Sequence, residues 1–349
     1  MHCRPFLRLP RTASLLLVVT AIATLAASSA WAQAKKATPA GAPAAAAPTP
    51  LNWPTKPVRI LVGFPAGSSP DLVARAFAEP LSKALGQPVI VETKVGAGGN
   101  IAADQVAKAT DDHTIGVMVN GNLTIAKLLN RNTPFDPAKD LVPVSLIGTA
   151  PLVLTAAANT PGTTIQDFFV AARNGGNKWS YGTPGIGTVG HIGMELLKSK
   201  SNIDPVHIPY PSNPQVATAM IGGQINLALL PPALAMAQVK AGKLKAIGVT
   251  SAGRSPLAPE LPTLAEGGIP GFQLEIWTAV AAPASMPKPI VAKLSALVSE
   301  IARTPDMRAR LFQQGWQTAG TTAEGLSNRM KADTALLGGV ILMRGIKAE

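Results

Sequence analysis

The sequence predicts an α/β protein of two lobes with a ligand cleft between them. The chain has 349 residues, which is enough for two domains. From Lys56 onward, apolar strand-like runs alternate with helical patterns, and the alternation restarts after the Pro-rich stretch 133–143. Because α/β sheets bind ligands beyond the carboxyl ends of their strands, two such units predict a cleft at those ends.

The elements of the first unit follow the order expected of parallel strands joined by helices. We expect strands over 57–64, 88–93, 114–120 and 144–147, and helices over 71–85 and 101–109. The second unit repeats the alternation, with strands over 152–155, 178–181, 206–208, 225–230 and 245–250, and helices over 165–173, 189–199 and 215–221.

The chain then returns to the first unit. It crosses back over 259–271, adds a strand over 274–281, and ends in two or more helices from Pro289 onward. We therefore assign residues 53–150 and 270–349 to lobe 1 and residues 151–269 to lobe 2. The hinge between the lobes is expected near Ala150 and Ile269.

Composition excludes several classes of protein. Hydrophobic residues make up 47% and charged residues 14%, which argues against a disordered chain. The net charge of +12 favours nucleic-acid binding only weakly, because aromatic residues are 4% and no basic run is interleaved with them. The single cysteine, Cys3, and four histidines show no metal-ligand spacing, so we expect no thiol chemistry and no metal site.

The amino end has the pattern of a secretory signal peptide. Three arginines without any acidic residue precede the apolar run 15–27, and the small-x-small triplet Ala30-Trp31-Ala32 follows. We expect residues 1–32 to be removed on export. The alternative, a retained membrane anchor, conflicts with an apolar run shorter than the roughly 20 residues that cross a bilayer. Residues 33–52 are rich in Ala and Pro, which predicts an extended linker.

The first candidate segment leaves the first strand and enters a helix. Ser69 is expected to cap this helix, Pro70 to occupy its first position, and Asp71 to complement its dipole. The free N–H groups of such a turn, with the hydroxyls of Ser68 and Ser69, suit an anion, most simply a carboxylate. The alternative is a well-capped helix with nothing bound, in which Asp71 pairs with Arg75 on the helix surface.

Two further turns are weaker candidates. Residues 96–100 are rich in glycine, but they complete no GxGxxG and follow the second strand, so we expect neither NAD nor ATP there. We interpret them as a tight turn into a helix capped by Asn100. The same interpretation applies to Asn120 and Gly121 after the third strand.

The most suggestive segment is 181–191, a strand followed by a glycine-rich loop and a helix start. Its glycines allow close approach of the backbone to a ligand, and Thr183 and Thr188 can donate hydrogen bonds. His191 is either a packing or capping residue or a ligand contact. Tyr210, beside another strand end, suits a cleft lining, and Asn213 is expected to cap the next helix.

No catalytic arrangement is present. There is no GxSxG, no HExxH, and no paired acidic residues on the candidate loops. A hydrolase would have to rely on Asp71 or His191 alone, so binding without turnover is the preferred interpretation.

Taken together, these segments resemble the Bug-type extracytoplasmic solute receptors of tripartite tricarboxylate transporter systems. The resemblance covers 53–349 and rests on the runs WPTKPVRILVGFPAGSSPD, VETKVGAGGNIAADQVAK, SYGTPGIGTVGHIGMELL, VHIPY, GGQINLALLPPALAMAQVKAGKLKAIGVTSAGRSPLAPELPTLAEGGIPGF and APASMPKPIVAKL. It implies a type II periplasmic binding protein fold whose two lobes close on a small carboxylated solute, without a cofactor. It also implies a periplasmic location and membrane transporter subunits as partners, and we expect a monomer. A sensor that signals to a membrane kinase is the alternative.

The resemblance also implies a set of ligand-binding residues. One lobe supplies Phe64, Ala66, Gly67, Ser68, Ser69 and Asp71, and the other supplies Thr183, Gly185, Ile186, Gly187 and Thr188, with His191 just behind. Many relatives carry an acidic or amide residue where this chain has Leu230-Pro231-Pro232. A partner for an amino group is thereby lost, so we expect a solute with an apolar or carboxylate-only far end.

Overall fold

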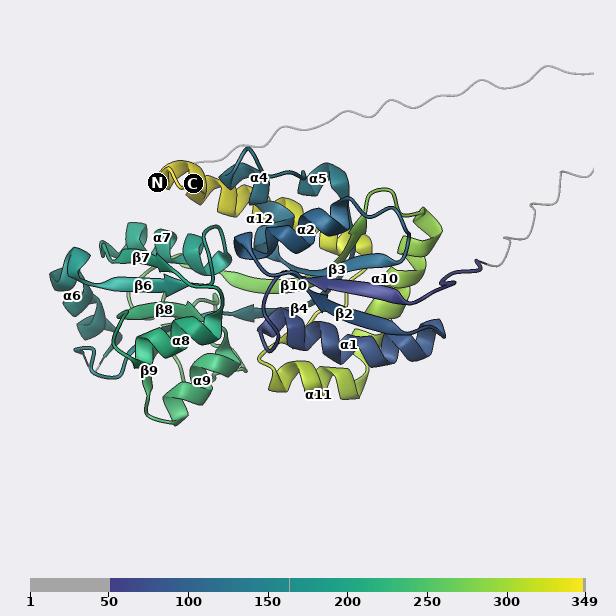
Figure 1. The fold of residues 1–349 in the computed structure, drawn as a ribbon. Coiled ribbons are helices and arrows are strands. Elements are labelled where there is room, and N and C mark those ends of the chain that lie inside the picture. Colours follow the sequence, from purple (N-terminus) through teal and green to yellow (C-terminus); the bar gives the residue numbers. More distant parts are fainter. Residues whose placement is uncertain (1–50, 163, 348–349) are drawn as a thin grey trace, which may run out of the picture. The chain divides into compact units, whose positions relative to one another are not determined.

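The computed structural model describes residues 51–162 and 164–347 (Figure 1). The predicted signal peptide 1–32 and linker residues 33–50 lie outside the described residues. The described residues form two sheets, each accompanied by helices, as the α/β prediction requires.

The first sheet has six strands in the order β11-β4-β10-β3-β1-β2. Its strands are β1 (Val58–Val62), β2 (Val89–Thr93), β3 (Thr114–Val119), β4 (Leu141–Pro151), β10 (Glu275–Pro283) and β11 (Gln317–Thr318). Its helices are α1 (Ser69–Leu85), η1 (Ala97–Gly99), α2 (Asn100–Ala107), α3 (Asn120–Thr124), α4 (Ala126–Leu129), α5 (Pro137–Asp140), α10 (Lys288–Arg303), α11 (Pro305–Gln313) and α12 (Ala323–Arg344).

The second sheet has five strands in the order β7-β6-β8-β5-β9. Its strands are β5 (Val153–Ala157), β6 (Ser180–Thr183), β7 (Val206–Pro209), β8 (Leu227–Leu230) and β9 (Leu244–Val249). Its helices are α6 (Ile165–Gly175), η2 (Gly176–Lys178), α7 (Val189–Ser201), α8 (Asn213–Ile221) and α9 (Pro232–Lys240). Each predicted strand and helix is present.

The expectation of parallel strands in the first unit is confirmed for β1, β2 and β3, but both sheets are mixed. The pairs β1–β2, β1–β3, β6–β7 and β6–β8 are parallel, whereas β10 runs antiparallel to β3 and β4, and β5 runs antiparallel to β8 and β9. Local alternation of strands and helices does not reveal the direction of β10, which returns after a long excursion and inserts between β4 and β3.

Three predicted helix caps are wrong by one position. The capping residue is the preceding one in each case: Ser68, Gly99 and Ser212 in place of Ser69, Asn100 and Asn213. A proline fits wherever a first-turn N–H is free, so Pro70 and Pro214 do not decide which residue begins the helix. The Asn100 side chain instead accepts a hydrogen bond from the Asn122 amide at 2.9 Å.

The cores explain why the helices form where they do. On α1, Val73, Phe77 and Leu81 follow the spacing of one helix face, and all three are buried against the first sheet. Burying each such side chain contributes about 1.5–3 kcal/mol.

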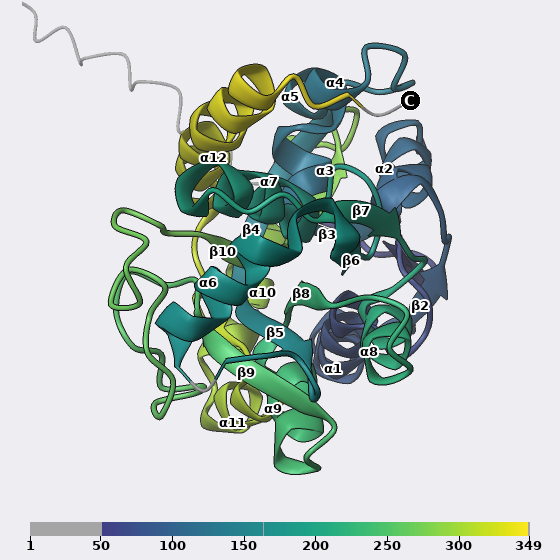
Figure 2. The same cartoon turned by 90° about the vertical axis from the view of Figure 1, so that its left-hand side faces the viewer.

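Helix α12 spans both sheets. Near its start, Leu326 packs in the cluster of Trp277, and near its end Leu337 and Ile341 pack in the core of the second sheet. Figure 2 shows α12 passing beside α7, and Arg344 pairs with Glu195 of α7 at 3.3 Å. The carboxyl-terminal helix therefore ties the two sheets together, in addition to the chain that runs directly from β4 into β5.

None of the helices in the described part of the chain is both long and apolar enough to span a membrane.

Candidate ligand-binding site

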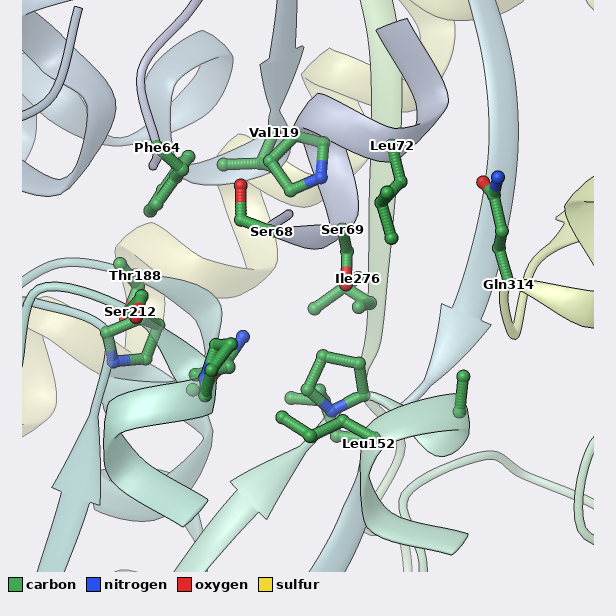
Figure 3. A pocket seen from close by; sticks show the side chains of 18 of the residues that line it. Phe64, Ser68, Ser69, Leu72, Val119, Leu152, Thr188, Ser212, Ile276 and Gln314 are labelled. Atoms are coloured by element: carbon green, nitrogen blue, oxygen red, sulfur yellow. The ribbon is translucent and has the colours of Figure 1, made fainter. Parts of the chain in front are cut away.

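The starts of four helices line one cavity of about 350 Å³. Helix α1 belongs to the first sheet, whereas α7, α8 and α9 belong to the second. The end of β3, the strand β10 and the segment that joins α11 to β11 also contribute to the lining. Figure 3 shows side chains from both sheets facing this cavity.

The four helix starts keep their first-turn N–H groups available. Their capping residues are Ser68, Thr188, Ser212 and Pro231, and none makes a side-chain cap hydrogen bond. Thr188 Oγ1, for example, donates to the Gly185 carbonyl at 2.8 Å instead. Because a helix start carries partial positive charge and unpaired N–H groups, the gathering of four of them favours an anionic occupant.

The lining contains no charged side chain. The residues that line the cavity are apolar, or carry neutral hydroxyl, amide and indole groups. A bound anion would therefore be stabilised by N–H and O–H donors rather than by a cation. Such donors are the usual partners of a carboxylate that is not paired with Lys or Arg.

Several lining residues have buried polar atoms without a hydrogen-bond partner. They are Ser68 Oγ, Asn120 Oδ1, Asn213 Oδ1, Gln314 Oε1 and Trp316 Nε1. Nearly all buried polar atoms in folded proteins have a partner, so a cluster of exceptions around one cavity needs an explanation. A polar solute, with bridging waters, would supply the missing partners.

Asp71 positions the first loop. Its carboxylate is buried, accepts a hydrogen bond from the Gly67 N–H at 2.8 Å, and pairs with Arg75 at 3.0 Å. The ion pair that we considered as an alternative is therefore present, with its acidic member inside the protein. Gly67 has a φ of 81°, a conformation that favours glycine, so the carboxylate holds a turn that few other residues would adopt.

His191 is buried behind the second loop and stacks on the half-buried His207. Its Nδ1 accepts a hydrogen bond from the Gly187 N–H at 3.2 Å, and its ring stacks on His207 with centroids 4.2 Å apart. His207 Nε2 lies 2.7 Å from Thr183 Oγ1. Burial, and then the neighbouring His191, lower the pKa of His207 to about 4, and burial lowers the pKa of His191. Both rings are neutral at pH 7.

The structure divides the predicted residues into three groups. The first cavity is lined by Phe64, Gly67, Ser68, Ser69, Asn120 and Thr188. A second cavity of about 520 Å³ is lined by Phe64, Gly121, Gly185, Ile186, Gly187 and Tyr210. Neither cavity is lined by Ala66, Asp71, Thr183 or His191.

Sequence reasoning missed part of the first cavity. It did not identify Ser212 as a lining residue, although Ser212-Asn213-Pro214 has the same pattern as the Ser68-Ser69-Pro70 turn. It also missed Gln314 and Trp316, which follow α11 and carry no local signal of binding. In the described residues, no group of three or more His, Cys, Asp or Glu could hold a metal ion.

Comparisons with known proteins identify the family and the fold. The family model of the tripartite tricarboxylate transporter family receptor matches residues 73–345. An adipate-bound protein from R. palustris is 29% identical with a TM-score of 0.81, covering 85% of this chain and 99% of that protein. MatC from Rhodopseudomonas palustris, with bound malate, is 31% identical with a TM-score of 0.78, covering 83% and 100%.

The periplasmic binding protein BugD is 31% identical with a TM-score of 0.79, covering 85% of this chain and 100% of that protein. The resemblance to Bug-type receptors and the periplasmic binding protein fold are thus confirmed. The chain belongs to the tripartite tricarboxylate transporter receptor family, a family of periplasmic solute-binding proteins rather than enzymes.

Proposed function

We propose that this protein captures a small organic acid in the periplasm and delivers it to the membrane subunits of a tripartite tricarboxylate transporter. Export would use the signal peptide 1–32, with 33–52 as a linker. The observation that carries the proposal is the uncharged cavity in which four uncapped helix starts meet unpartnered polar side chains. This arrangement suits a carboxylate, and it contains no activated nucleophile.

The solute would be held between elements of the two sheets. A carboxylate bound at the start of α1 can also interact with the starts of α7 and α8, which belong to the other sheet. Because these interactions form together only when the two sheets approach each other, the solute stabilises the closed arrangement. We propose that the lobes, 53–150 with 270–349 and 151–269, turn about a hinge near Ala150 and Ile269.

The similar structures support the solute class. One was solved with adipate and another with malate, and both cover more than four fifths of this chain. Both solutes are small carboxylates, so the uncharged, donor-rich cavity of this chain is proposed to hold an acid of the same general kind.

A thermal unfolding screen tests the proposal. The purified protein is heated with mono-, di- and tricarboxylates, aromatic acids and amino acids. A ligand at about one hundred times its Kd adds roughly 2.7 kcal/mol to the free energy of unfolding, which raises the Tm by a few degrees. The matched control is the neutral amide of each acid that binds. Equal shifts with acid and amide, or no shift with any acid, would contradict carboxylate capture.

Two further experiments test the kind of solute and distinguish transport from sensing. Binding of aspartate or glutamate would contradict the expectation that Leu230-Pro231-Pro232, in place of an acidic or amide residue, disfavours an amino group. Deletion of the gene should abolish uptake of the identified acid, whereas intact uptake with a lost transcriptional response would show a sensor instead.

A further inference from the structure

The loop between β6 and α7 has little rigidity of its own. Gly185 has a φ of +121° and Gly187 a φ of +78°, in the region that favours glycine. Because glycine has no side chain to restrict the backbone, such a loop keeps one conformation only when other groups hold it. Residues 184–187 all line the second cavity, and Pro184 also lines the first. The conformation of this loop therefore shapes both cavities.

The same loop contacts elements that accompany the first sheet. A Cβ on Gly185 would lie 3.4 Å from the Cα atom of Gly98 in η1, and a Cβ on Gly187 would meet the side chain of Leu129 in α4. A change in the loop would therefore alter the contact between the elements of the two sheets as well as the shape of the cavities.

His191 holds the end of the loop. The Gly187 N–H donates to His191 Nδ1 at 3.2 Å, and the His191 side chain is 6% exposed. A ring nitrogen that accepts a hydrogen bond carries no proton, so this contact requires the neutral ring with its proton on Nε2. Gly187 is itself buried, so its N–H depends on this acceptor.

Thr183 and His207 hold the start of the loop. Thr183 Oγ1 donates to the Gly185 carbonyl oxygen at 3.2 Å and lies 2.7 Å from His207 Nε2. Because a hydroxyl has one proton, the His207 Nε2–H is then the donor to Thr183. The Thr188 hydroxyl donates to the same Gly185 carbonyl at 2.8 Å. Both ends of the loop are thus tied to an imidazole.

A column of three stacked rings fixes the two imidazoles. His207 stacks on His191 with centroids 4.2 Å apart, and on Tyr181 with centroids 4.9 Å apart. The Tyr181 hydroxyl donates to Glu195 at 2.7 Å, which anchors the other end of the column. Because each ring packs against the next, His191 Nδ1 keeps its direction toward the loop.

We propose that His191, with Thr183 and His207, is a positioning residue for solute binding that holds the loop 184–187 against the elements of the first sheet. None of the three residues lines the first or the second cavity, so they act through the loop and not by touching the solute. This inference rests on the proposed function, because it concerns the affinity of the receptor for its acid.

Hydrogen–deuterium exchange of the protein without solute tests whether His191 holds the loop. His191→Phe keeps a ring in the column and removes the acceptor, so the peptide that contains Gly187 should exchange about fivefold faster or more. His191→Asn places a side-chain oxygen near the position of Nδ1 and should bring exchange to within about twofold of the wild type. Equal exchange of this peptide in His191→Phe and the wild type would overturn the proposal.

Calorimetric titration with adipate and with malate measures the effect on binding. His191→Phe should raise the Kd about five- to tenfold, and His191→Asn about twofold or less. The control is His113→Phe, because His113 is also 6% exposed and its Nε2 also accepts a backbone N–H, from Thr55 at 3.1 Å. His113 lines neither cavity and lies outside the ring column, so its replacement should leave the Kd unchanged.

Thr183→Val gives a second test, which does not depend on the folding of His191→Phe. It removes the hydroxyl and should also raise the Kd and speed exchange of the loop. Equal effects of His191→Phe and His113→Phe on the Kd, or no recovery in His191→Asn, would show a merely structural role. Failure of every carboxylate to bind the wild type would instead contradict the proposed function, and the exchange result would still decide whether His191 holds the loop.

Discussion

Ser68 shows how one side chain can be poor for stability and good for binding. Its hydroxyl is buried at the start of α1 and has no partner, although it lies where it could cap that helix. Ser201, near the end of α7, is buried to a similar extent but donates to the Leu197 carbonyl at 2.6 Å. The two serines therefore form a matched pair. Both are buried, but only the Ser68 hydroxyl, in the cavity, has no hydrogen-bond partner.

Replacing Ser68 should change the affinity for the solute, whereas replacing Ser201 should change the free energy of unfolding. Ser68→Ala is expected to raise the Kd for the solute about five- to tenfold, because a hydrogen bond worth about 1–1.5 kcal/mol is lost, without lowering the free energy of unfolding. Ser201→Ala should lower the free energy of unfolding by about 1 kcal/mol and leave the Kd unchanged. Calorimetry and urea unfolding measure the two quantities. An unchanged Kd in Ser68→Ala would remove Ser68 from the site.

At the scale of elements, the two sheets meet through glycines. A Cβ on Gly121, at the start of α3, would lie 3.0 Å from the carbonyl oxygen of Gly187, in the loop before α7. A Cβ on Gly98 would lie 3.2 Å from the carbonyl oxygen of Ile186 in the same loop. Close approach of these backbones leaves little room for side chains.

Gly121→Ala tests whether this approach matters for binding. Gly121 lies in a helix at a φ that alanine adopts, so the added methyl group acts mainly through its contact with Gly187. We expect a several-fold rise in Kd, because the methyl group opposes closure, and little change in the free energy of unfolding, because alanine favours a helix by about 1 kcal/mol. The control is Gly339→Ala in α12, where a Cβ meets nothing within 4 Å. Equal Kd values for both variants would contradict a role for the glycine contact.

At the scale of the whole molecule, the stacked histidines make stability depend on pH. The pKa of His207 is about 4 in the fold, against about 6.5 in an unfolded chain. Between these values the unfolded chain binds more protons, so the free energy of unfolding falls as pH falls through this window. The loss from His207 is at most about 3 kcal/mol.

Urea unfolding at pH 7.5 and pH 4.5 measures this dependence. The wild type should be less stable at the lower pH. His207→Gln removes the titrating ring and should show a smaller difference between the two pH values, although its carboxylates still titrate. The same difference in variant and wild type would show that the histidine stack does not govern the pH dependence.

The sequence by itself determined the α/β class, the positions of β1 to β10 and of most of the longer helices, and the loops that precede α1 and α7. It did not predict the helices α3, α4, α5 and α9 or the short strand β11. These are local properties, since hydrophobic periodicity and turn residues depend on neighbours in the chain. The same locality explains the small errors at the caps, where Ser68 and Ser69 both suit a helix start.

Only the tertiary structure decided the antiparallel direction of β5 and β10 and which residues share a cavity. It placed Asp71 and His191 behind their loops, where one holds a glycine turn and the other stacks on His207. It also brought Trp316 and the start of α9 to the cavity that Ser68 lines. These residues lie on separate elements whose approach depends on the packing of both sheets, and no local pattern in the sequence carries that information.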